Sequence, residues 1–232
     1  MSIASNLARV HDEIVNACAR ARRAPHSVAL MAVSKMNPPE ALLEAYAAGH
    51  RLFGENRVQE WQTKRVSLPD LLPAVDVHLI GPLQNNKTAK AAEIFDAVDT
   101  LDSLKTAERL NAAAQSLNKT LRVLVEVKLS HEDTKHGLAP AELPTLLAAL
   151  QPLHHLEVRG LMTVPPLNDA PETARPYFQH LRRLRDENIA LYPTLTELSM
   201  GMSNDFAIAI EEGSTTIRIG TAIFGKRTYP NP

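Results

Sequence analysis

The sequence predicts an α/β fold, a single (β/α)8 barrel of the TIM type with an extra helix at its N-terminus. Eight apolar, strand-like runs recur along the chain, with helical patterns between them. The runs occupy about residues 28–34, 51–55, 76–82, 97–101, 121–129, 156–163, 195–201 and 215–224. Strict alternation of strand and helix implies parallel strands joined by right-handed crossovers. Eight units in 232 residues suit a compact barrel.

Helix signals support this alternation. Representative helices are expected at about residues 2–22, 39–46, 104–117 and 141–150. The first carries apolar residues three and four positions apart, with Cys18 among them as a small core residue. The second begins at a proline and ends before Gly49, and Ser103 is an N-cap signal for the third.

A doubly wound open sheet is the alternative architecture. It would need fewer strands, and a glycine-rich phosphate loop would normally follow its first strand. Here Ser34-Lys35-Met36-Asn37 follows that strand. No break in composition divides the chain, so we expect residues 1–232 to form one domain.

Composition excludes several classes of function. Lys and Arg number 25 against 26 Asp and Glu, so no strong electric field attracts nucleic acid or an anionic membrane. No apolar run approaches the length of a membrane span, and the first residues lack the apolar core of a signal peptide. The nine histidines show no metal-ligand spacing. We therefore expect a cytoplasmic protein that binds no nucleic acid, membrane or metal.

Lys35 is the strongest candidate for chemistry. It follows a strand that is expected to be buried on both faces, and Pro38 and Pro39 prevent a helix from extending back over it. Barrel active sites lie at the carboxyl ends of the strands. A desolvated lysine there becomes a nucleophile toward a carbonyl carbon, which makes Lys35 a candidate Schiff-base lysine. The alternative is a surface lysine that points into water.

Two segments near the ends of the seventh and eighth strands predict a phosphate site. Ser203 leads into a helix at about residues 204–208, so its hydroxyl can act together with free backbone amides. Gly220 and Thr221, placed in the eighth strand, allow close approach to the backbone. Phosphate sites in barrels recur after strands seven and eight. The alternative is an ordinary N-cap and a tight turn.

Arg218 and His78 are expected inside the barrel. Arg218 alternates with isoleucines, so its side chain points toward the barrel mouth. A buried guanidinium requires a partner, either a carboxylate such as Glu126 or Glu197 or an aromatic nitrogen of a ligand. His78 is either a satisfied core histidine or a ligand contact.

Together, six ordered motifs resemble the pyridoxal-phosphate homeostasis protein family, of the proline synthetase co-transcribed homologue type. The motifs are Ala32–Lys35, Phe53–Asn56 with Val58–Glu60, His78–Lys87, Arg159–Met162, Ser199–Asp205 and Ile217–Gly225. The resemblance covers nearly the whole chain. It implies a barrel similar to the N-terminal domain of alanine racemase, with pyridoxal 5′-phosphate (PLP) as cofactor.

The resemblance also implies roles for nine residues. Lys35 would hold PLP as a Schiff base, and Arg218 would face the pyridine nitrogen. Phosphate contacts would come from Ser203, Gly220 and Thr221. Asn56, His78, Met162 and Ser199 would line the pocket.

The implied function is PLP binding in intracellular vitamin B6 homeostasis without robust catalysis. An arginine beside the pyridine nitrogen disfavours its protonation and weakens the ring as an electron sink. We also expect no second domain to supply an opposing base. The alternatives are a PLP-dependent amino-acid racemase or lyase, and a barrel aldolase that uses Lys35 without cofactor. Expected partners are PLP and PLP-dependent apo-enzymes, and the expected state is a monomer.

Overall fold

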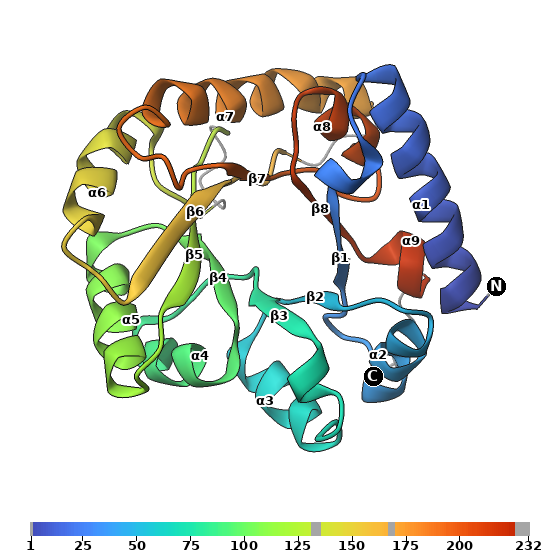
Figure 1. The fold of residues 1–232 in the computed structure, drawn as a ribbon, viewed down its shortest axis with the longest axis horizontal. Helices are drawn as coiled ribbons and strands as arrows, with labels where there is room; N and C mark the ends of the chain where they lie inside the picture. The colour runs from blue at the N-terminus through green and yellow to red at the C-terminus, as the bar shows by residue number, and fades with distance from the viewer. Residues whose placement is uncertain (1, 131–135, 167–169, 226–232) are drawn as a thin grey trace.

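The computed structural model, which describes residues 2–130, 136–166 and 170–225, is a closed barrel of eight parallel strands in chain order (Figure 1). The strands are β1 (Ala29–Val33), β2 (Leu52–Glu55), β3 (Asp76–Leu79), β4 (Ala97–Leu101), β5 (Leu121–Glu126), β6 (Leu156–Met162), β7 (Glu197–Ser199) and β8 (Thr216–Ile219). Each strand pairs with the next, and β1 pairs with β8. The predicted fold class is confirmed.

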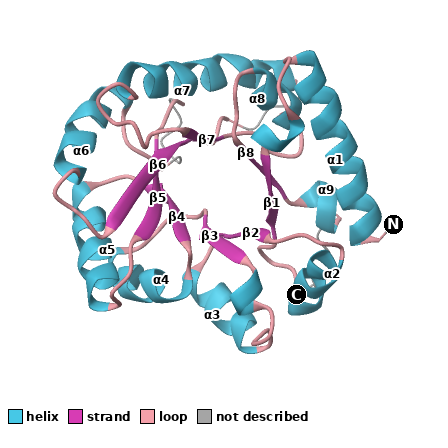
Figure 2. Ribbon diagram, in the orientation of Figure 1, coloured by secondary structure: helices cyan, strands magenta, loops and turns pink. Residues whose placement is uncertain are grey.

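Helices form a ring around this barrel (Figure 2). They are α1 (Ile3–Arg20), α2 (Pro39–Ala47), α3 (Val58–Val66), α4 (Thr88–Ile94), α5 (Leu104–Ser116), α6 (Leu143–Leu150), α7 (Arg175–Asn188), α8 (Phe206–Glu211) and α9 (Thr221–Phe224). Among the described residues, no helix has the length and apolar character that crossing a membrane requires. The same residues contain no group of three or more His, Cys, Asp or Glu side chains placed so that they could hold a metal ion.

The extra N-terminal helix, α1, packs against α9, the helix of the last β/α unit. Ser2 caps α1 by accepting a hydrogen bond from the Ser5 amide, and the apolar face, including the fully buried Cys18, packs into the core. Asn6 Nδ2 donates to the Ile223 carbonyl at 2.8 Å. Since Ile223 lies in α9, α1 holds the turn that follows β8.

The prediction that a strand extends through residues 215–224 is wrong at its carboxyl end. Strand β8 stops at Ile219, and residues 221–224 form α9, with Gly220 as the N-cap. The amides of Ile223 and Phe224 donate to the Gly220 carbonyl at 3.0 and 2.9 Å. Short apolar runs do not distinguish a strand from a buried helical turn, and packing against α1 stabilises the turn here.

His78 is a paired histidine of the barrel interior. Its Nδ1 lies 3.0 Å from Asp99 Oδ1 on β4, and its Nε2 lies 3.2 Å from Asp76 Oδ1 on β3. Arg122 on β5 donates to the same Asp76 oxygen at 2.6 Å. Burial lowers the pKa of His78, but the charges of Asp99 and Asp76 outweigh burial and raise it to about 10. The imidazolium therefore stabilises this charge cluster.

We predict that the free energy of unfolding contains a His78 contribution that is lost at alkaline pH. The pKa of His78 is raised to about 10 in the folded state, against about 6.5 when unfolded. Its contribution is therefore fully present below about pH 6.5 and is lost as pH rises toward about 10. Urea unfolding across this range should show a flatter profile for His78→Gln than for the wild type.

The control is His26→Gln, since His26 is exposed on the surface. It should keep the wild-type profile. Parallel profiles for His78→Gln and the wild type would contradict the assignment of a charged His78.

Candidate functional site

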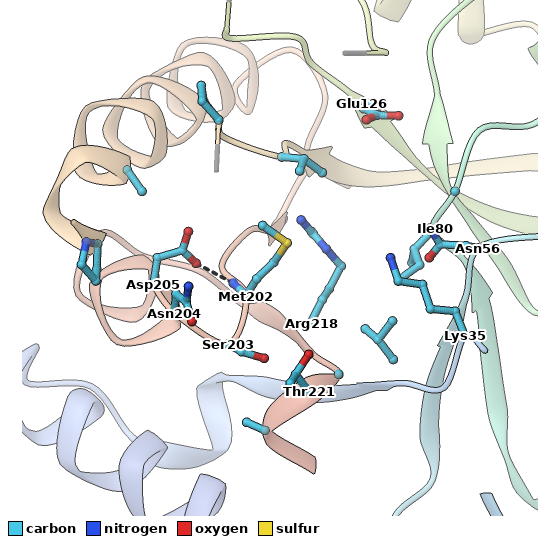
Figure 3. Close-up of a pocket in the computed structure, with 18 of the residues that line it drawn as sticks. Lys35, Asn56, Ile80, Glu126, Met202, Ser203, Asn204, Asp205, Arg218 and Thr221 are labelled. Atoms are coloured by element: carbon cyan, nitrogen blue, oxygen red, sulfur yellow. Dashed lines mark hydrogen bonds between the residues drawn. The ribbon is translucent and has the colours of Figure 1, made fainter. Parts of the chain in front are cut away.

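A cavity of about 910 Å³ opens at the carboxyl ends of the strands (Figure 3). Its walls come from the loops after β1, β2, β3, β7 and β8, and from the segments that follow β5 and β6. Six of the nine site residues predicted from the sequence line it: Lys35, Asn56, Ser203, Arg218, Gly220 and Thr221. His78, Met162 and Ser199 are absent from the lining.

The Lys35 side chain reaches from one wall of the cavity, and Arg218 and Thr221 face it from another (Figure 3). Lys35 follows β1 in a tight turn, where the Asn37 amide donates to the Ser34 carbonyl at 3.0 Å. The Asn37 side chain also donates to the Lys35 carbonyl at 3.2 Å. Lys35 is half-buried. The amine is thus carried by a defined turn at the mouth of the barrel.

The loop after β7 turns sharply to present its backbone to the cavity. Gly201 has φ of +98°, and a Cβ there would lie 2.6 Å from the Ala209 side chain, so only glycine fits. Asp205 Oδ1 accepts from the Met202 amide at 2.6 Å. Among the described residues, the amides of Ser203 and Asn204 have no hydrogen-bond acceptor. With the Ser203 hydroxyl, they can bind an anion.

The loop after β8 lies on the same side of the cavity. The prediction that Gly220 and Thr221 lie in the eighth strand is wrong. Both residues lie at the start of α9. Their approach to β1 is close, because a Cβ at Gly220 would lie 3.3 Å from the Val33 carbonyl oxygen. The start of α9, with the Thr221 hydroxyl, lines the same cavity as the loop after β7.

Arg218 is held by neutral groups. Its Nη1 donates to Ser199 Oγ at 2.7 Å and its Nη2 donates to the Thr163 carbonyl at 2.8 Å. Only 4% of the residue is exposed. Burial lowers the pKa of Arg218, although nearby carboxylates oppose this effect. Two of its nitrogens are thereby fixed, and the guanidinium borders the cavity as a cation in a set orientation (Figure 3).

One alternative from the sequence was an ion pair between Arg218 and a barrel carboxylate such as Glu126 or Glu197. The described residues do not form it. Among the described residues, no carboxylate lies within 4 Å of its nitrogens. Glu197 instead accepts from Arg159 Nε at 3.2 Å, and both side chains are partly exposed. In the described part of the chain, the barrel interior therefore holds a cation that contacts no carboxylate.

Three predicted site residues do not line the cavity, namely Ser199, Met162 and His78. Ser199 contacts the cavity only through Arg218, whose guanidinium it orients. Met162 is fully buried at the end of β6. His78 belongs to the interior cluster with Asp76 and Asp99.

Sequence reasoning missed a buried charge cluster beside Lys35. Lys64 on α3 is 7% exposed, and its Nζ lies 2.8 Å from Glu55 Oε1 and 2.7 Å from Glu60 Oε1. Ser34 Oγ donates to the same Glu55 oxygen at 2.7 Å. Burial raises the pKa of Glu55, and Lys64 opposes this effect. The four-residue spacing of Glu60 and Lys64 is the only sequence signal for this cluster. The same spacing also fits an ion pair on the exposed face of a helix.

The site combines three chemical capacities in one cavity. An amine can condense with a carbonyl carbon, hydroxyls and free amides can bind an anion, and a fixed guanidinium can face a hydrogen-bond acceptor. A ligand that satisfies all three carries an aldehyde or ketone, an anionic group and a hydrogen-bond acceptor atom.

Comparison with known proteins gives a consistent result. The family model "Alanine racemase, N-terminal domain" matches residues 7–228. A pyridoxal phosphate homeostasis protein of Pasteurella multocida is 42% identical over 231 residues, 99% of each chain.

Solved structures agree. PipY of Synechococcus elongatus PCC7942, solved with PLP bound, is 42% identical, with a TM-score of 0.85 over 97% of this chain and 100% of PipY. The alanine racemase of Clostridium difficile 630 shares the fold at 15% identity, with a TM-score of 0.74 over 99% of this chain and 57% of the racemase. With matches of this similarity over nearly its whole length, the chain belongs to the pyridoxal phosphate homeostasis protein family, whose barrel is that of the alanine racemase N-terminal domain.

Proposed function

We propose that this protein binds PLP, holds it as a Schiff base on Lys35, and acts in intracellular PLP homeostasis without robust catalysis. One observation carries the proposal: Lys35, Arg218 and the two anion-binding loops face a single cavity. The name of the 42% identical relative and the PLP-bound PipY structure support it.

The residues of the cavity fit three functional groups of PLP. The Lys35 amine suits the aldehyde, and their condensation forms an imine and releases one water molecule. The hydroxyls of Ser203 and Thr221, with neighbouring amides, suit the phosphate. Arg218 suits the pyridine nitrogen, since a guanidinium only donates hydrogen bonds. A cavity of about 910 Å³ is ample for a molecule of this size.

Arg218 supports the absence of robust catalysis. Bound PLP supplies an electron sink to amino-acid substrates, and that sink is strongest when the ring nitrogen is protonated. Arg218, oriented by Ser199 and Thr163, donates a hydrogen bond to the ring nitrogen but keeps its proton, so the ring nitrogen stays unprotonated. The shared fold with alanine racemase keeps a racemase or lyase as the second candidate function.

The proposal extends to the protein's setting. We expect a cytoplasmic monomer that delivers PLP to PLP-dependent apo-enzymes. A formal net charge of −1 gives no electrostatic reason to bind nucleic acid or a membrane surface.

The Schiff base is tested by reduction. Borohydride treatment of the protein with PLP should fix the cofactor on Lys35, because this lysine lines the cavity next to the proposed phosphate loops. Peptide mass spectrometry locates the adduct, and Lys35→Ala should abolish it. An adduct confined to Lys87 or Lys128, with Lys35 unmodified, would refute the assignment.

The phosphate loops are tested by removing two hydroxyls. Ser203→Ala combined with Thr221→Val should weaken PLP affinity by about tenfold or more, since a hydrogen bond to a charged group contributes roughly 1.5–3 kcal/mol. Equilibrium dialysis against PLP measures the change. The matched control, Ser116→Ala with Thr63→Val, alters exposed helix residues. Unchanged affinity in the folded Ser203/Thr221 variant would place the phosphate elsewhere.

We predict that the PLP-loaded protein turns over amino acids far more slowly than the roughly 1–1000 per second of typical enzymes. The reason is the weak electron sink beside Arg218. Incubation with L-alanine and other L-amino acids, followed by assay of enantiomers, keto acids and amines, measures it. Several turnovers per second that Lys35→Ala abolishes would establish the racemase or lyase alternative.

A further inference from the structure

The backbone on both sides of Lys35 is held by side chains of α3. Lys64 Nζ donates to the Ser34 carbonyl at 2.8 Å. Glu60 Oε1 accepts from the Met36 amide at 2.5 Å. The residues immediately before and after Lys35 are thus bound to two residues one helical turn apart. Neither Glu60 nor Lys64 lines the cavity.

The cluster that makes these contacts is itself fixed. The Lys64 ammonium donates to the Ser34 carbonyl and to Glu55, and it forms an ion pair with Glu60 at 2.7 Å. Between Glu60 and Lys64, Trp61 is 1% exposed, and its indole Nε1 donates to the Ile94 carbonyl at 2.9 Å. Helix α3 is therefore locked against its neighbours and is a rigid support for the Lys35 turn.

Met36 shows why such a support is needed. Its φ is +61°, in the left-handed region that side chains other than glycine disfavour. Its own side chain is 58% exposed, so apolar packing does little to stabilise this conformation. Hydrogen bonds stabilise it instead: the Met36 amide donates to Glu60, and Asn37 donates to the carbonyls of Ser34 and Lys35. Strained residues of this kind persist only where surrounding contacts determine them.

We propose that Glu60 is a positioning residue for Lys35, acting through the Met36 amide and, with Lys64, through the Ser34 carbonyl. This inference rests on the proposed Schiff base at Lys35. The carboxylate keeps Met36 left-handed, and the turn then aims the amine at a carbonyl carbon held in the cavity. Misplacement of a reacting group by about 1 Å costs up to about 100-fold in rate.

The test compares Glu60→Ala, Glu60→Gln and a control, Glu40→Ala, in the full chain. Glu40 is exposed in the first turn of the nearby α2. Absorbance follows imine formation with PLP, and borohydride mapping confirms its place. Pyridoxine 5′-phosphate, which has a phosphate and a pyridine ring but no aldehyde, reports on the rest of the site.

We expect Glu60→Ala to slow imine formation by about tenfold or more. Glu60→Gln should retain most of the rate, because its amide oxygen can still accept from the Met36 amide. Pyridoxine 5′-phosphate affinity should match the wild type in all three variants, and Glu40→Ala should match the wild type in every measurement. Far-UV circular dichroism verifies folding, and Glu60→Gln remains informative if Glu60→Ala does not fold.

Three results would overturn the inference. One is an unchanged rate of imine formation in Glu60→Ala. Another is a parallel loss of pyridoxine 5′-phosphate affinity, which indicates a general structural role. The third is a rate for Glu60→Gln as low as that of Glu60→Ala, which indicates that the acceptor contact is not decisive. A wild-type protein that forms no imine on Lys35 would refute the proposed function itself, and this inference with it.

Discussion

The pairing of β1 with β8 is the constraint on which the site depends. It joins the first and last strands of the barrel, with Ala32 opposite Ile219. Lys35 and Thr221, nearly the whole chain apart in sequence, therefore emerge from adjacent strands. Gly220 approaches the Val33 carbonyl so closely that a side chain would crowd it. Closure of the barrel thus brings the Lys35 amine and the loop after β8 to the same cavity.

Two buried cations near this cavity, Arg218 and Lys64, have different roles and different hydrogen-bond partners. Arg218 bonds to Ser199 and to the Thr163 carbonyl, which orient the cation without neutralising it. Lys64 is paired with carboxylates and stabilises the turn behind Lys35. Among the described residues, the cation that borders the cavity therefore contacts no carboxylate, whereas the cation that contacts carboxylates lies outside the cavity lining.

Much of the barrel could be predicted from the sequence because apolar runs and helix signals are local features. The end of β8 could not, since Ile223 and Phe224 would suit a strand or a helical turn, and packing against α1 decides between them. Placement of Lys35 at the same cavity as Thr221 and Ser203 follows from barrel geometry, so it was predictable once the fold was. The partners of His78 and Lys64 are set by side-chain contacts between different elements, which periodicity does not encode.

The central claim is that Lys35, Arg218 and the loops carrying Ser203 and Thr221 converge on one PLP molecule. A crystal structure of the protein grown with PLP tests it most directly. We expect electron density continuous from Lys35 Nζ to the cofactor, the pyridine nitrogen at Arg218, and the phosphate between Ser203 and Thr221. Density for PLP at another lysine, or in this cavity with its phosphate away from both loops, would contradict it.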